Sequence, residues 1–260
     1  YSGSGYFENL NRMLSYFEIP LYDKEYILKN NLNRYQTFPW GLDDRAMIET
    51  GKQFVKDEGI PFVHYYYFTN THSPYFNPEP DKFNRHDNSG DYGRYKNVIE
   101  YNLSLIKNMQ NFIERISSGK TIYILLSDHG ESFGESGFYK HGFSIFNQEI
   151  RVPFYINIPA KSGIEINQEG SILDIMTTLA SIQNIDDPYF RDGKFLFSKK
   201  HNLKLRLSSW GTKSFRGLIE NNKKFIFNLN NENLLESDLE EKNIQNNEDI
   251  EIKKRIRLNE

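Results

Sequence analysis

The sequence predicts an α/β fold, in which a largely parallel sheet with helices on both faces is followed by a small antiparallel sheet. Two observations lead to this prediction. Up to residue 200, short apolar runs alternate with longer segments whose apolar residues recur at helical spacing, which is the pattern of parallel sheets. Beyond residue 200, apolar residues alternate at period two over 203–207 and further short apolar runs follow, which indicates antiparallel strands.

The first part of the chain is expected to contain two helices, one strand and a long loop. Helical spacing of apolar residues predicts a helix over 7–17, closed by Pro20, and a second helix over 43–56. The aromatic run 62–68 is typical of a buried strand. Residues 69–93 are rich in Asn, Pro, Asp and His and predict a long loop, and ordered loops of that length are usually functional.

The middle of the chain continues the alternation. One face of apolar residues predicts a long helix over 95–116 that packs on the sheet. Apolar runs then predict strands over 121–126 and 152–158, and a further helix is expected over 172–182.

The C-terminal part is predicted to be a small antiparallel sheet with a charged tail. An Asn-Asn pair between two of its strands is a hairpin signal. The expected strands are 203–207, 215–219 and 225–227. We therefore predict an α/β domain over 1–200 and a small C-terminal α+β subdomain over 201–260, whose tail from residue 240 is a surface helix or frayed.

Composition limits the classes of function. The formal net charge is −3, which gives no electrostatic footprint for nucleic acid. The chain has no cysteine, so disulfides and thiolate metal sites are excluded. We find no signal peptide and no apolar run of about 20 residues, the length that a membrane-spanning helix needs. The first residue is Tyr1, so we expect these 260 residues to be part of a longer protein.

The strongest functional signal follows the 121–126 strand. Asp128 and His129 stand side by side where the strand ends, and open α/β sheets place their chemistry at such ends. Carboxylate oxygen suits a hard divalent cation, and imidazole shifts the preference toward zinc or manganese. These residues are therefore predicted metal ligands for Ca, Zn or Mn. The structural alternative is an Asp that caps the next turn beside a surface His.

Three further residues are candidates for contact with a substrate. His141 precedes a glycine and could hydrogen-bond an anionic oxygen or a leaving group, although a loop histidine beside a glycine turn is an equal alternative. Lys140 could complement an anion, or it could simply be solvated. His72 follows the 62–68 strand, so we expect it at the same sheet edge as Asp128. Of the remaining histidines, His64 is expected in the core and His86 and His201 at the surface.

Several short segments follow one another over residues 1–200. They are Trp-Gly-Leu-Asp-Asp at 40–44, Thr-His-Ser-Pro-Tyr at 71–75, Ser-Asp-His-Gly-Glu at 127–131, Phe-Gly-Glu at 133–135, Tyr-Lys-His-Gly at 139–142, Ile-Arg-Val-Pro-Phe at 150–154, Leu-Asp-Ile-Met-Thr-Thr-Leu at 173–179 and Asp-Gly at 192–193. Together they resemble the sulfatase branch of the alkaline phosphatase superfamily. That branch includes arylsulfatases, phosphoethanolamine transferases and lipoteichoic-acid-synthase-like enzymes.

The resemblance implies an alkaline-phosphatase-like fold and a metal-dependent enzyme that acts on a sulfate or phosphate ester through a covalent intermediate. It implies that Asp128 and His129 bind the metal and that His72 and His141 contact the ester or its leaving group. The family's nucleophile is a formylglycine made from Cys, or a Thr. That nucleophile and a further acidic ligand normally lie upstream of where this chain begins, so the nucleophile is left unassigned here.

Three functions stay open at this point. We favour hydrolysis of a sulfate or phosphate ester of a small molecule, glycan or lipid. The alternative is transfer of phosphoethanolamine or phosphoglycerol to a cell-surface lipid or glycan. A non-catalytic fragment or pseudoenzyme is the third, because the nucleophile is missing. Family resemblance also implies an extracytoplasmic location, periplasmic or tethered to a membrane through residues outside this chain.

Overall fold

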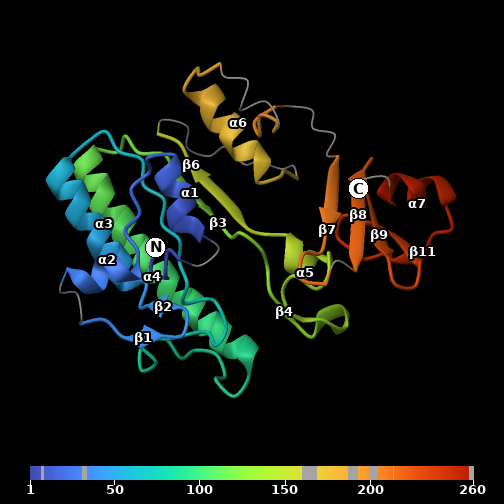
Figure 1. Ribbon diagram of the computed structural model, residues 1–260, viewed down its shortest axis with the longest axis horizontal. Coiled ribbons are helices and arrows are strands. Elements are labelled where there is room, and N and C mark those ends of the chain that lie inside the picture. The colour runs from blue at the N-terminus through green and yellow to red at the C-terminus, as the bar shows by residue number, and fades with distance from the viewer. Residues whose placement is uncertain are drawn as a thin grey trace. The chain divides into compact units, whose positions relative to one another are not determined.

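The computed structural model describes residues 1–6, 9–30, 34–159, 169–186, 193–198, 204–212 and 214–257. The chain divides into two compact units, Tyr1–Thr121 and Ile122–Glu260. Figure 1 shows their helices and strands and labels most of them. They are called the N-terminal and the C-terminal unit below, and each is described by itself.

Helices dominate the N-terminal unit. The predicted helices near 7–17, over 43–56 and over 95–116 are confirmed as α1, α3 and α4, whereas the short helix α2 and the two-residue strands β1 and β2 were not predicted. The elements are α1 (Leu10–Tyr16), α2 (Lys24–Lys29), β1 (Thr37–Phe38), β2 (Gly41–Leu42), α3 (Arg45–Glu58) and α4 (Asp91–Ser117). Ile27, Leu42 and Ala46 form a fully buried cluster that joins α2, β2 and α3.

The predicted buried strand over 62–68 is the first departure from expectation. These residues belong to no strand of the described chain. Val63 is 98% and Tyr65 is 80% exposed, while Phe62, His64 and Tyr66 are partly buried. An aromatic run alone does not make a strand, because the backbone needs a neighbouring strand to bond with. The loop that follows is confirmed, and it ends where α4 begins at Asp91.

The C-terminal unit opens with two of the predicted strands. They are β3 (Tyr123–Leu126) and β6 (Phe154–Asn157), and they pair antiparallel. All strand pairings among the described residues are antiparallel, so the largely parallel sheet expected from the sequence is not found among them. The physical reason lies in the connection: β4 (Ser132–Phe133), η2 (Glu135–Gly137), β5 (Tyr139–Lys140) and α5 (Asn147–Ile150) separate β3 from β6. No long crossover helix, which parallel strands usually need, lies between them.

The small C-terminal antiparallel sheet is confirmed. It has five strands in the order β11-β10-β9-β8-β7. At the predicted hairpin, Asn221 and Asn222 have φ values of 52° and 58°, which fits the turn that joins two twisted strands most tightly. The elements are β7 (Leu205–Ser208), β8 (Phe215–Glu220), β9 (Lys223–Asn228), β10 (Leu234–Asp238) and β11 (Gln245–Asn246). Helix α6 (Leu173–Ile182) precedes them and confirms the expected helix, and α7 (Ile250–Arg257) follows within the charged tail.

The two faces of this sheet are buried against different partners. Successive residues of β9 point to opposite faces, so Phe225 and Phe227 pack in one cluster with Ile256 of α7. Ile226 packs on the other side with Ile145 and Phe146. This second cluster anchors the segment just after His141 to the C-terminal sheet.

Some expectations are not tested by the described residues. The predicted domain boundary between residues 200 and 201 stays a prediction. His201 and Asp192 lie outside the described residues. Within the described ranges, none of the helices combines the length and apolarity that crossing a bilayer requires.

Candidate active site

Asp128, His129 and His141 lie where the chain leaves β3 and forms a short hairpin. β4 pairs with β5 in a register that places Ser132 opposite Lys140. Continuing this antiparallel register by one residue brings Glu131 opposite His141, because each step along one strand is a step back along the other. The hairpin thus returns His141 to the end of β3, next to His129.

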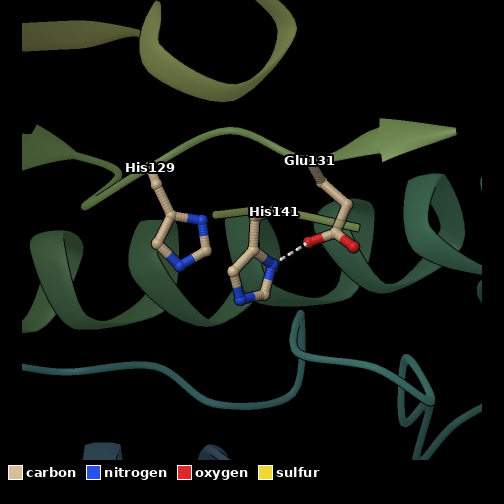
Figure 2. A group of neighbouring side chains, drawn as sticks. All are labelled: His129, Glu131 and His141. Carbon is tan, nitrogen blue, oxygen red and sulfur yellow. Dashed lines mark hydrogen bonds and ion pairs between the residues drawn. The ribbon is translucent and has the colours of Figure 1, made fainter. Parts of the chain in front are cut away.

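Three side chains converge at this point. Figure 2 shows His129, Glu131 and His141 directed toward one another, and one donor atom from each lies within 4.8 Å of the others. The two imidazole rings stack with centroids 4.0 Å apart. The sequence singled out both histidines but assigned no role to Glu131, whose position depends on the register of a hairpin with two-residue strands.

Glu131 and His141 form a partly buried hydrogen-bonded pair. Nδ1 of His141 lies 2.7 Å from Oε2 of Glu131, and the side chains are 15% and 7% exposed. This hydrogen bond raises the pKa of His141 above its ordinary value, although burial opposes the shift. Glu131 accepts a hydrogen bond from the Nδ1–H of His141 and thereby fixes which ring nitrogen carries the proton and how the ring is oriented.

His129 is oriented in a similar way by the backbone. Its Nδ1 lies 2.8 Å from the carbonyl oxygen of Gly130, so Nδ1 carries a proton and Nε2 is the ring nitrogen left to bind a metal. Nε2 in turn lies 3.8 Å from Oδ2 of Asp128. Two ligands at about 2.1 Å from one ion can be up to about 4.2 Å apart, so this spacing fits a shared divalent ion. The mixed oxygen and nitrogen donors suit zinc or manganese better than calcium.

A buried carboxylate supports the segment that carries these residues. Glu149 is 3% exposed and accepts hydrogen bonds from the Ser144 hydroxyl (2.6 Å), the Ser132 hydroxyl (3.3 Å) and the backbone N–H of Phe143 (3.1 Å). It therefore ties both sides of the hairpin together. No pattern in the sequence singled out Glu149 for a functional role.

Gly130 allows the backbone after β3 to lie directly against the backbone of Gln148 and Glu149. Its N–H donates to the carbonyl oxygen of Glu149 at 2.8 Å. A Cβ on Gly130 would collide with the carbonyl oxygen of Gln148. Glycine is required here because two backbone segments meet without room for a side chain.

Lys140 lies in β5 immediately before His141. Its side chain is partly exposed, and its backbone has φ of 70°. Its predicted contact with a substrate anion stays a prediction.

His72 belongs to the N-terminal unit. Its ring contacts Trp40 with centroids 4.1 Å apart, and its Nδ1 lies 2.9 Å from the carbonyl oxygen of Ser73. The expected convergence of His72 with Asp128 and His141 stays a prediction.

The loop that carries His72 is held by the buried carboxylate of Asp44. This side chain accepts hydrogen bonds from the backbone N–H groups of Thr69 and Asn70, both at 2.9 Å. Asn102 of α4 donates at 3.1 Å and the Ser2 hydroxyl donates as well. Burial raises the pKa of Asp44, and these hydrogen bonds oppose the shift. Sequence reasoning noted Asp44 only as part of a family-like landmark.

The other described histidines have local partners. The prediction that His64 lies in the core is wrong: it is partly exposed, with Nδ1 2.9 Å from the Tyr66 hydroxyl. Burial nevertheless lowers the pKa of His64. His86 has a side chain 34% exposed and lies 3.5 Å from a Glu100 oxygen.

Comparison with solved structures defines the fold class. A protein in the alkaline phosphatase superfamily from Vibrio parahaemolyticus matches with a TM-score of 0.71 at 16% identity, over 99% of this chain and 62% of that one. A second structure, Ps i-CgsB, matches with a TM-score of 0.63 at 15% identity, over 79% of this chain and 50% of that one. The chain therefore shares the fold of these two proteins, the first of which is described as a member of the alkaline phosphatase superfamily.

The family model described as Sulfatase matches residues 5–185. Because this match covers more than half of the chain, the protein belongs to the sulfatase family. Lipoteichoic acid synthase from Staphylococcus saprophyticus is 23% identical over 229 residues, which cover 82% of this chain and 35% of that protein. The chain thus spans about a third of this curated relative and between half and two thirds of the two solved structures.

Proposed function

We propose that the protein is a metal-dependent hydrolase of the sulfatase family that cleaves a sulfate or phosphate ester through a covalent intermediate. The observation that carries this proposal is the cluster at the end of β3. There, Asp128 and His129 present an oxygen and a nitrogen 3.8 Å apart, and Glu131 orients His141 beside them.

Asp128 and His129 are the residues that would hold the metal. Their donor types and spacing fit a divalent ion such as zinc or manganese. When bound, such an ion offsets charge on the ester oxygens and lowers the pKa of a nucleophile. We assign Glu131 to His141 rather than to the metal, because its Oε2 already accepts the hydrogen bond from Nδ1.

The remaining residues bind and orient the ester. With Nδ1 directed at Glu131, His141 has Nε2 on the opposite side of its ring, from which it can hydrogen-bond the leaving-group oxygen. Cleavage breaks the bond between that oxygen and phosphorus or sulfur, and a protonated His141 would supply the proton that the departing alcohol needs. Lys140 would attract the anionic ester, and His72 keeps its predicted role as a contact to the ester.

A second candidate is transfer of phosphoethanolamine or phosphoglycerol to a cell-surface lipid or glycan. The similarity to a lipoteichoic acid synthase favours it. Both candidates share the same cluster and differ in whether water or an alcohol accepts the transferred group. The family resemblance supports a location outside the cytoplasm, periplasmic or tethered to a membrane through residues outside this chain.

The decisive experiment uses the full-length protein. We expect stoichiometric divalent metal by elemental analysis and hydrolysis of p-nitrophenyl sulfate or p-nitrophenyl phosphate. Asp128→Ala should lose both, while Asp81→Ala, at an exposed position of the long loop, should keep both. Release of p-nitrophenol that rises with added glycerol, with formation of a glycerol ester, would favour the transferase. Absence of metal and turnover from the wild-type protein would overturn the proposal and favour a scaffolding role.

A further inference from the structure

A solvent-exposed tryptophan lies beside the candidate site. Trp210 is in the turn between β7 and β8, and it is 65% exposed. Its ring centroid lies 6.0 Å from that of His141, with 33° between the ring planes. Since His141 stacks on His129, the indole continues a row of rings that leads to the predicted metal ligand.

The position of this indole is fixed by the backbone around Gly142. Gly142 has φ of 86°, and a Cβ there would come within 2.7 Å of the indole Cε2. The N–H of Gly211 donates to the carbonyl oxygen of Gly142 at 2.7 Å. Glycine at 142 therefore allows the backbone of the His141 segment to lie directly against the Trp210 ring.

A second exposed aromatic ring adjoins the same turn. Phe143 is 41% exposed, and a Cβ on Gly211 would lie 3.7 Å from its Cδ1. The Thr212 hydroxyl also donates to the carbonyl oxygen of Phe143 at 3.4 Å. The segment after His141 and the β7–β8 turn thus form an open aromatic edge next to the site.

We propose that Trp210 is a specificity-determining residue that stacks on a sugar ring in the alcohol part of the ester. This role rests on the function proposed above, because the anionic group of the same ester would occupy the cluster of His129 and His141. Aromatic faces are electron-rich and attract the positive edge of a neighbouring group, such as the C–H face of a pyranose.

The openness of the indole favours a saccharide over a lipid chain. An acyl chain gains most from an enclosed apolar groove, whereas Trp210 offers one flat face that is largely in water. A pyranose has an apolar face and a rim of hydroxyl groups, so it can stack on one ring while its hydroxyls stay hydrated.

The test compares sugar esters with an anion that has no ring, using the full-length protein. The substrates are the 6-sulfates and 6-phosphates of glucose and N-acetylglucosamine, and p-nitrophenyl esters report basal turnover. Inorganic phosphate, as a competitive inhibitor, reports the anion site alone. In Trp210→Ala we expect KM for the sugar esters to rise about tenfold, the upper range for an aromatic contact, with a smaller change in kcat.

The inhibition constant of phosphate should change much less than KM does. Trp210→Phe should recover most of the loss, since it keeps an aromatic face. Tyr16→Ala, which removes an exposed aromatic ring of α1, should leave KM unchanged.

Two results would overturn the role of Trp210. One is turnover of p-nitrophenyl esters without turnover of any of the four sugar esters. The other is an equal effect of Trp210→Ala on sugar-ester KM and on phosphate inhibition, since a residue that only positions His141 would give that result. A protein that binds no metal and cleaves no ester would instead refute the proposed function, and with it this role.

Discussion

Oε2 of Glu131 lies 2.7 Å from Nδ1 of His141, and this pair connects the two ends of the β4–β5 hairpin. It gives His141 a defined tautomer and raises its pKa. A histidine held in this way presents Nε2 to a substrate in a fixed direction. The relationship can be tested separately from any catalytic activity.

The first prediction concerns the titration of His141 in metal-free protein. Glu131→Gln should lower the pKa of His141 toward the ordinary value of about 6.5, because the carboxylate that stabilises the imidazolium is gone. NMR titration of the imidazole protons in the presence of a chelator measures this directly. An unchanged His141 pKa in Glu131→Gln would show that the pair does not control the protonation of His141.

The same pair should affect stability with a defined pH dependence. A raised histidine pKa stabilises the folded state fully below about pH 6.5, the unfolded value, and this contribution disappears as pH rises through the folded pKa. Glu131→Gln should therefore reduce the melting temperature more at about pH 5.5 than at about pH 8.5. Thermal melts of the wild-type protein and of Glu131→Gln, recorded in a chelator at the two pH values, measure this difference in melting temperature.

The second prediction separates metal ligands from orienting residues. His129→Ala should abolish stoichiometric metal binding in the full-length protein, because it removes a direct ligand. Glu131→Gln should keep metal affinity close to that of the wild type, because Glu131 hydrogen-bonds His141, which we assign to the ester and not to the metal. Calorimetric titration with Zn²⁺ and Mn²⁺ distinguishes them. Equal loss in both variants would make Glu131 a ligand in its own right.

The third prediction concerns the loop that carries His72. Asp44→Ala should lower the free energy of unfolding by about 3 kcal/mol or more, because buried backbone N–H donors lose their acceptor. Asp81→Ala, which lies exposed in the same long loop, should change it by less than about 0.5 kcal/mol. Urea denaturation of the two variants provides the comparison, and similar values would show that Asp44 is not an anchor.

The fourth prediction concerns the close approach at Gly130. Gly130→Ala should cost about 1–3 kcal/mol of stability, because the new Cβ collides with the backbone of Gln148. Metal affinity should fall as well, since the neighbouring His129 would move. Gly90→Ala, whose Cβ would meet no atom within 4 Å, should keep wild-type metal affinity. Full metal binding by Gly130→Ala would contradict the prediction.

Local patterns predicted many of the individual elements. The apolar face of α4 and the apolar run of β3 are encoded within single segments of the chain, so their periods were sufficient. β10 was missed because Glu236, Ser237 and Asp238 resemble a charged loop, although they pair with β9. The segment 62–68 was predicted wrongly for the opposite reason, since its composition suits a strand but no described strand pairs with it.

The sequence by itself determined the ligand types at Asp128 and His129, the exclusion of thiolate chemistry and the likeness to the sulfatase family. Only the tertiary structure decided that Glu131 faces His141 and that Trp210 reaches the same histidine from a distant turn. Side-chain chemistry and helical or strand periods are local properties of a chain. Which residues meet depends on strand register and packing between segments, and these are settled only when the chain folds.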